Sequence, residues 1–289
     1  MKGLLIFSIF ILSLKVSAQN DLAQQSSTYE SYLTNSSKFT TNATAIADTT
    51  FFAVAEYMKV EPGMEADYLK TEALWKKFHQ SRKDAKQIMN WRLFRRVFPS
   101  GTKTDFDYIT VTFYQNGEKM QASETTMNWD AITKGMTTDE TTMAKNTGKT
   151  RQLVNNQLFN YLVGFNGTQT SKYYVLYNLK TSQENAADYE KYLTKLLPLN
   201  QEVAKSGKLA AWSAWSNTIN TNVNAPNYLG VYQFANMNDA INQMTDKLTY
   251  REAYRKVYPA ENYDTVVKRR NELRQIVTTE LWELVDQTK

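Results

Sequence analysis

The chain has 289 residues, with 34 Lys and Arg against 29 Asp and Glu and a formal net charge of +5 at pH 7. This excess is small and spread along the sequence, so it gives no indication of a nucleic-acid partner. The absence of cysteine excludes disulfide bonds, thiolate nucleophiles and thiolate-bound metals. With a single histidine, a metal site that needs several histidines is excluded as well. Stability must therefore come mainly from the burial of apolar side chains.

The N-terminus has the pattern of a secretory signal peptide. A positively charged start is followed by an apolar run over residues 3–14 and then by the small residues Ser17 and Ala18. We expect residues 1–18 to be cleaved after Ala18 and the protein to be secreted or periplasmic. Cleavage leaves 32 Lys and Arg against 29 Asp and Glu, a net charge of +3. The run is shorter than the roughly 20 residues of a bilayer-spanning helix, so we expect no membrane association after cleavage.

Residues 19–50 are rich in Ser, Thr, Asn and Gln and favour a flexible polar leader. Residues 51–60 are rich in aromatic and β-branched side chains and precede Glu61-Pro62-Gly63, which predicts a strand followed by a turn. From residue 64 to about 82 the apolar residues recur with helical spacing. This pattern indicates a helix with one buried face, packed on a sheet.

Two further strands follow the first helix. Residues 88–97 and 107–114 alternate apolar and polar side chains, and a loop with Pro99 and Gly101 joins them, which predicts a hairpin. The polar stretch that follows, to about residue 150, is expected to be mostly helical. Residues 158–163 then indicate a closing strand, with a helix as the alternative.

The same order of elements occurs a second time. The tripeptide Ala-Asp-Tyr at residues 66–68 recurs 121 residues later at 187–189, and the block at 151–159 recurs 123 residues later at 274–282. A tandem duplication is the simplest explanation. The elements of the second copy are expected at residues 172–179, 184–205, 209–216, 228–234, 237–275 and 279–285.

Each copy has the order β-α-β-β-α-β, which is the ferredoxin-like unit. The copies are expected at residues 51–164 and 173–289, with a linker at 165–172. One face of such a sheet is bare, and exposing it to water costs about 25 cal/mol per Å². We therefore predict an α+β fold: two tandem ferredoxin-like βαββαβ repeats whose antiparallel sheets pack as an intramolecular pseudo-dimeric α/β barrel. Such a barrel is complete in a monomer.

This order resembles the dimeric α/β-barrel superfamily in a fused, two-repeat form. The resemblance is carried by the helix with Tyr68, Trp75 and His79 and by the strands with Trp91 and Tyr108. The superfamily includes NIPSNAP-like proteins, antibiotic-biosynthesis monooxygenases and stress-responsive barrel proteins. The resemblance implies two sheets that close face to face around a cavity. Members range from cofactor-free oxygenases to haem proteins and chains without known activity, so no particular chemistry is implied.

The candidate catalytic residues are His79 and Glu72. They lie two helical turns apart on one flank of the first predicted helix, with Trp75 between them. A carboxylate that holds an imidazole beside an apolar wall could form a general base or a single-histidine ligand site. The second copy has Leu193 and Asn200 at these positions, so such a site would belong to the first copy alone. The alternative is that both residues lie at the border of the helix and have no catalytic role.

Arg95 is the candidate anchor for an anionic group. Alternation along its strand places it on one face with Trp91, whereas Arg92 and Arg96 share the other face with Phe94. An arginine on a cavity face can bind a carboxylate or phosphate through two hydrogen bonds. The alternative is an arginine at the rim that pairs with an acidic neighbour. Aromatic side chains near it could line a cavity or fill a core. The expected ligand-binding residues are therefore Arg95 and the aromatic residues Tyr57, Tyr68, Trp75 and Trp91.

Three functions are compatible with these patterns. We prefer an exported barrel protein that binds a small apolar or aromatic molecule in its cavity. The second is a cofactor-independent monooxygenase in which His79 is the base and Glu72 orients it. The third is a structural or interaction module with a packed barrel. Motifs for dinucleotide binding, P-loop phosphate binding, serine hydrolases and zinc proteases are absent, and we expect neither a cofactor nor a metal.

Overall fold

The structure is a computed structural model. It describes residues 51–101, 104–126, 129–167, 169–217, 225–245 and 250–289. The chain divides into two units, Met1–Asp48 and Thr49–Lys289, and all described residues belong to the second. The predicted signal peptide and polar leader, residues 1–18 and 19–50, lie outside the described residues.

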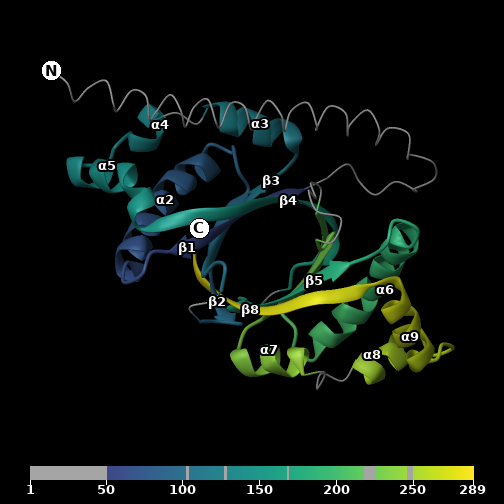
Figure 1. The fold of residues 1–289 in the computed structure, drawn as a ribbon. Coiled ribbons are helices and arrows are strands. Elements are labelled where there is room, and N and C mark those ends of the chain that lie inside the picture. The colour runs from purple at the N-terminus through teal and green to yellow at the C-terminus, as the bar shows by residue number, and fades with distance from the viewer. Residues whose placement is uncertain (1–50, 102–103, 127–128, 168, 218–224, 246–249) are drawn as a thin grey trace. The chain divides into compact units, whose positions relative to one another are not determined.

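The described residues contain a closed barrel of β-strands in which every neighbouring pair is antiparallel (Figure 1). The order around the barrel is β1-β3-β2-β8-β5-β7-β6-β4. The strands are β1 (Phe52–Val60), β2 (Asn90–Phe98), β3 (Tyr108–Tyr114), β4 (Arg151–Phe165), β5 (Tyr173–Lys180), β6 (Ala211–Asn217), β7 (Tyr228–Phe234) and β8 (Gln275–Gln287).

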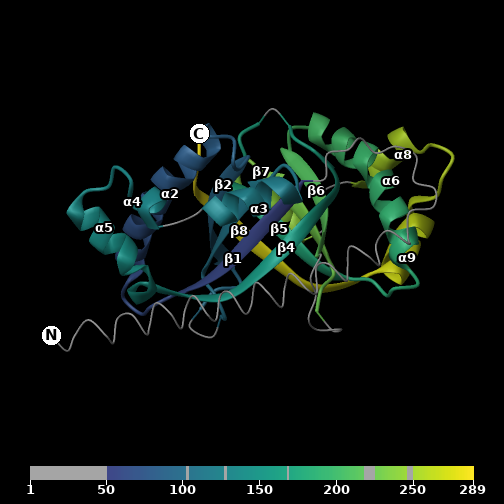
Figure 2. The ribbon, with the colours of Figure 1, turned by 90° about the horizontal axis from the view of Figure 1, so that it is seen from above.

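Helices cover two opposite sides of the barrel wall. Those of the first half lie on one side and those of the second half on the other (Figures 1 and 2). No described helix is long and apolar enough to cross a membrane. The helices are α2 (Glu65–Asp84), α3 (Gly117–Thr126), α4 (Trp129–Thr133), α5 (Thr138–Lys145) and the 3₁₀ helix η1 (Thr147–Lys149), then α6 (Ala186–Lys205), α7 (Met237–Met244), α8 (Tyr250–Val257) and α9 (Tyr263–Leu273).

Both halves have the predicted strand and helix order, and in both the sheet order is that of the ferredoxin-like unit. The fourth strand of each half is longer than expected. β4 begins at Arg151 rather than near residue 158, and β8 begins at Gln275 rather than near residue 279. The helix considered for residues 158–163 is wrong, because these residues pair with β1 and β6 on either side.

β4 and β8 each join the two halves, because one end of each strand pairs within its own half and the other end pairs with a strand of the other half. β4 pairs with β1 along Arg151–Asn160 and with β6 along Phe159–Phe165. β8 pairs with β5 along Gln275–Glu283 and with β2 along Leu281–Gln287. The two sheets are thus hydrogen-bonded edge to edge at two seams, β4–β6 and β2–β8, rather than only packed face to face.

Both faces of the barrel wall are buried, but against different partners. The outer face packs under the helices, under α2 in the first half and under α6 to α9 in the second. The inner face combines side chains from both halves and fills much of the barrel. Its buried members are Ala53, Ala55, Phe94, Ile109, Phe159, Tyr174 and Trp282.

The β4–β6 seam leaves no room for a side chain at Gly164. A Cβ atom there would lie 2.4 Å from the Trp212 carbonyl oxygen and 2.7 Å from the Ser213 Cα atom. We expect Gly164→Ala to lower the free energy of unfolding by about 1–3 kcal/mol, because the backbones of the two strands must separate. Gly148→Ala is the matched control, since a Cβ atom there meets nothing within 4 Å. Urea denaturation of both variants tests this, and equal stabilities would contradict the tight seam.

Candidate functional site

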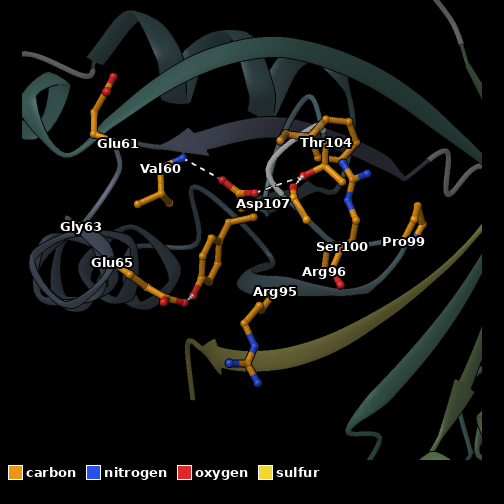
Figure 3. Close-up of a pocket in the computed structure, with 13 residues that line it drawn as sticks. Val60, Glu61, Gly63, Glu65, Arg95, Arg96, Pro99, Ser100, Thr104 and Asp107 are labelled. Carbon is orange, nitrogen blue, oxygen red and sulfur yellow. Dashed lines mark hydrogen bonds between the residues drawn. The ribbon is translucent and has the colours of Figure 1, made fainter.

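A cavity of about 300 Å³ lies at one end of the barrel in the first half (Figure 3). Its walls come from the turn between β1 and α2, from the end of β2 with the loop after it, and from the segment that leads into β3. The turn owes its shape to Gly63, whose φ of +78° favours glycine. The cavity thus lies where three chain segments leave the barrel wall.

Asp107 holds two of these segments together. Its carboxylate accepts hydrogen bonds from the Lys59 ammonium (3.1 Å), from the backbone N–H of Val60 (3.1 Å) and from the Thr104 hydroxyl (3.3 Å). Lys59 also donates to the Thr104 carbonyl oxygen at 2.8 Å. This carboxylate is therefore a structural clamp between the end of β1 and the segment before β3.

The other acidic groups at the cavity also have partners. The Glu65 carboxylate accepts a 2.6 Å hydrogen bond from the Tyr108 hydroxyl, and burial raises the pKa of Tyr108 above its ordinary value. The Glu61 carboxylate accepts a 2.6 Å hydrogen bond from the Gln152 side-chain amide. The described acidic side chains around the cavity are thus engaged in local contacts that hold its walls.

Two arginines reach the cavity from β2, and they point in opposite directions (Figure 3). Arg95 extends toward β8, where its Nη2 atom lies 2.6 Å from the Glu283 carboxylate. Lys172 shares the same carboxylate at 3.2 Å. Arg95 is therefore a half-exposed arginine with a fixed acidic partner, as in the rim alternative considered from the sequence.

Arg96 turns toward the inner face of the barrel instead. Its guanidinium carbon lies 3.6 Å from the centre of the Phe106 ring and 5.3 Å from that of Trp282, and these two rings stack on each other. The Nε and Nη2 atoms are buried without a hydrogen-bond partner. Burial lowers the pKa of Arg96, although the negative charge of Glu280 opposes the shift. Arg96 is a cation with unused donors at the wall of a cavity.

The inner wall beside Arg96 is held by its own hydrogen bonds. The Tyr57 hydroxyl donates to the Gln157 side-chain oxygen at 2.8 Å, and the Trp282 indole donates to the Glu280 carboxylate at 2.9 Å. Tyr57 also packs edge-on against Phe106, with ring centres 4.7 Å apart. Burial raises the pKa of the Tyr57 hydroxyl above its ordinary value, so it stays protonated at neutral pH.

The structure separates the ligand-binding residues expected from the sequence. Tyr57 is on the inner face and Arg95 lines the end cavity. Tyr68 and Trp91 lie between α2 and the outer face of the barrel, where Tyr68 packs on Tyr108 with ring centres 4.8 Å apart. Trp75 lies on α2 and donates to the Thr147 hydroxyl at 3.1 Å.

Glu72 and His79 have different partners on α2. The Glu72 carboxylate is 2% exposed and lies 3.2 Å from the Nε atom of Arg151. The His79 ring stacks on Trp91 with ring centres 5.3 Å apart, and its Nδ1 atom lies 3.2 Å from Nη1 of Arg82. The structure therefore gives each residue an arginine of its own and does not join them.

The two groups have opposite pKa shifts. Burial raises the pKa of Glu72 to about 7, although the charge of Arg151 opposes the shift. Burial and the nearby Arg82 lower the pKa of His79 to about 3. The imidazole is therefore neutral at pH 7 and a weak base. Since His79 is the only histidine and lies outside the barrel, the residues present do not fit a histidine-ligated haem in the barrel interior.

No three His, Cys, Asp or Glu side chains gather in a metal-binding arrangement within the described part of the chain. The residues that sequence reasoning missed are Arg96, Phe106 and Trp282. Alternation along β2 already placed Arg96 opposite Arg95, but nothing in it showed which face lines the barrel. The contact with Trp282 depends on the pairing of β2 with β8, from the far end of the chain.

The opposite pKa shifts predict opposite pH dependences of stability. The contribution of Glu72 is present below pH 4.5 and lost as the pH rises to about 7, because the folded state binds its proton more tightly. The contribution of His79 is present above pH 6.5 and lost as the pH falls toward 3, because the folded state favours the neutral ring. Wild-type stability should therefore vary less with pH than that of either single variant.

As the pH rises from 4.5 to 7, wild type loses the contribution of Glu72 and Glu72→Gln does not. We therefore expect the unfolding free energy of this variant, relative to wild type, to rise by about 3 kcal/mol over that range. His79→Asn copies Asn200 of the second half. As the pH rises from 4.5 to 6.5, wild type gains the contribution of His79 and this variant does not, so the unfolding free energy of the variant relative to wild type should fall by about 2–3 kcal/mol. Urea denaturation at a series of pH values measures both differences. Variant curves that run parallel to wild type would show that these groups are not buried as described.

No protein-family model matches the chain, and no curated protein matches it. A proposed monooxygenase from Fusobacterium nucleatum aligns with a TM-score of 0.51 and 8% identity over 83% of this chain and 94% of its own. A proposed monooxygenase from Lactobacillus acidophilus aligns with a TM-score of 0.48 and 11% identity, over 84% and 97% of the two chains. A proposed chlorite dismutase aligns with a TM-score of 0.47 and 11% identity, over 82% of this chain and 96% of its own.

At such low identity these likenesses concern the fold alone, and of these three structures the Fusobacterium protein has a TM-score above 0.5. The alignment covers 83% of this chain, which is more than either repeat alone contains. The chain therefore has the dimeric α/β-barrel fold expected from its sequence, with two fused repeats that build one barrel.

Proposed function

We propose that the protein binds a small planar organic anion, such as an aromatic carboxylate, in the cavity at the end of the barrel. The observation that carries this proposal is Arg96, whose buried Nε and Nη2 atoms have no hydrogen-bond partner. A guanidinium group presents paired donors that match the two oxygens of a carboxylate. An anion at this position would use donors that no described side chain uses.

The surroundings of Arg96 favour a planar ligand. Phe106 lines the cavity beside the guanidinium group, and it is backed by Trp282, which stacks on it, and by Tyr57, which packs edge-on against it. Aromatic ligands pack well in such walls, and a few polar groups then set their orientation. A cavity of about 300 Å³ is at the lower end of the range for small-molecule sites. It suits a ligand with one ring better than a larger molecule.

The cavity lining has three carboxylates and two arginines, and each of these groups except Arg96 has a hydrogen-bonded partner among the described residues. Asp107, Glu65 and Glu61 are already engaged with Lys59, Tyr108 and Gln152, as described above. Arg96 keeps its positive charge because even a lowered arginine pKa remains far above neutrality. The position 121 residues after Arg96 is Asn217, so the proposed site belongs to the first repeat alone.

The proposal includes an extracytoplasmic location and a monomeric chain. The pattern of residues 1–18 supports export. The two repeats together complete the barrel, which supports a monomer that needs no second chain to close it.

A cofactor-independent monooxygenase is the alternative, and the fold likeness to the Fusobacterium protein agrees with it only at the level of fold. Two observations weigh against His79 as its base. The ring lies on the outer side of the wall against Trp91, and its pKa is lowered to about 3 by burial. A general base works best when its pKa is near the working pH.

Binding of benzoate, measured by isothermal titration calorimetry, tests the proposed site. We expect Arg96→Gln to weaken benzoate binding about 10- to 100-fold, because a charge-assisted hydrogen-bonded pair is lost. The neutral isostere benzamide should bind wild type at least about 10-fold more weakly than benzoate. The exposed Arg255→Gln is the control for a general loss of positive charge.

Arg95→Gln separates this proposal from the anchor expected from the sequence. The Arg95 side chain points away and is held by Glu283, so its loss should change the affinity less than about 3-fold, within the effect of an exposed ion pair. A loss of binding in Arg95→Gln with normal binding in Arg96→Gln would overturn the proposal. Absence of saturable benzoate binding in wild type would favour the packed, structural barrel instead.

A further inference from the structure

The two seams leave the first part of β8 paired on one side. β8 pairs with β5 along Gln275–Glu283, whereas its pairing with β2 covers Leu281–Gln287. Among the described residues, no strand pairs with the other edge of residues 275–279, which we call the β8 overhang. No backbone hydrogen bond from a described turn or loop reaches this edge either. The β8 overhang thus prolongs the β2–β8 seam with a row of backbone N–H and C=O groups that face no described strand.

The side chains of the β8 overhang suit strand pairing. They are all uncharged and four of them are β-branched: Gln275, Ile276, Val277, Thr278 and Thr279. Ile276 and Val277 are 47% and 42% exposed. Phe98, which pairs with Leu281 where β2 ends, is 52% exposed. Natural proteins usually protect a free edge with charged residues, proline or a bulge, and a register shift at Val277 is the only such feature within residues 275–279.

The equivalent edge of β4 has the same geometry but less suitable residues. Residues 151–158 pair with β1 and with no other described strand, and the register shift falls at Val154, 123 residues before that of β8. However, Asn155 and Asn156 stand where β8 has two threonines. Asparagine is disfavoured in strands, whereas threonine is favoured. The β8 overhang is therefore the better pairing edge, and β4 provides a matched comparison within the same chain.

We infer that the β8 overhang binds an extended, uncharged peptide segment of a partner protein by strand addition. The backbone determines the kind of occupant, because a row of alternating donors and acceptors is matched by another extended backbone. The uncharged overhang and the exposed Phe98, Ile276 and Val277 favour a segment with β-branched or aromatic side chains. The added strand lies in line with β2 and lengthens the seam. Residues 275–279 do not line the cavity at Arg96, so this inference does not depend on the proposed function.

The probe is a short labelled peptide of alternating Thr and Val flanked by serines. Fluorescence anisotropy measures its binding to the purified full-length chain, and amide hydrogen exchange locates it. We expect saturable binding and slower exchange in residues 275–279, without slower exchange in residues 151–158. N-methylation of the valines blocks one edge of the peptide, and N-methylation of the threonines blocks the other. One of these two peptides should bind and the other should not, whereas equal binding of both would show that backbone pairing is not used and would overturn the inference.

Val277→Lys is the decisive variant, because a charged side chain on a free edge opposes strand addition. We expect it to weaken peptide binding at least about 10-fold, and Ile276→Lys repeats the test at the adjacent position. Val154→Lys makes the same change on β4, where the side chain is 46% exposed, and should alter binding less than about 3-fold.

Two results would overturn the inference directly. They are unchanged binding in both β8 variants and the absence of saturable binding to the parent chain. Sedimentation velocity tests a second copy of this chain as the occupant instead. Self-association of the parent chain that Val277→Lys removes would assign the β8 overhang to that copy and would also overturn the inference.

Discussion

The two seams of the barrel are the constraint on which the rest of the structure depends. A four-stranded ferredoxin-like sheet has two open edges and one bare apolar face. Here β4 and β8 are long enough to pair with the adjacent half, so both edges are closed and the two bare faces become one interior. The inner cluster accordingly joins Phe94 of the first half to Tyr174 of the second, whose rings meet edge-on at 4.8 Å.

Closure also determines how polar groups are distributed across the wall. Each strand has an inner face shared by both repeats and an outer face that belongs to its own repeat. The pair of Glu72 and Arg151 lies on the outer side, and Arg96 lies on the inner side near one end. The two repeats have diverged differently on each face. The first repeat has Glu72 where the second has Leu193, and it has Arg96 where the second has Asn217.

Much of the fold could be predicted from local patterns. The 121-residue offset paired Trp91 with Trp212, and both are buried at 1% exposure under their respective helices. Alternation separated Trp91 and Leu93 from Phe94 correctly, because one strand residue in two points to each face. These predictions succeeded since they depend on neighbours close in the sequence.

The candidate site could not be predicted in the same way. Both faces of a wall strand are buried here, so a hydrophobic pattern cannot tell the inside of the barrel from the layer under a helix. Trp91 resembled a cavity residue for this reason, although it supports α2 and stacks on His79. Arg96 could be recognised as a site residue only from its contacts with Phe106 and Trp282. Trp282 lies beside it because β8 pairs with β2.

The shared strands have a further consequence for how this duplicated chain unfolds. In a stacked repeat protein each repeat contacts only its neighbours, and stability is approximately a sum over the repeats and their interfaces. Here the first half of β4 is bound to β1 and its second half to β6, so neither repeat can come apart without removing hydrogen bonds from the other. The same holds for β8, and separation would expose the common interior. The two halves thus form one cooperative folding unit, in which a destabilising substitution in either repeat lowers the stability of both.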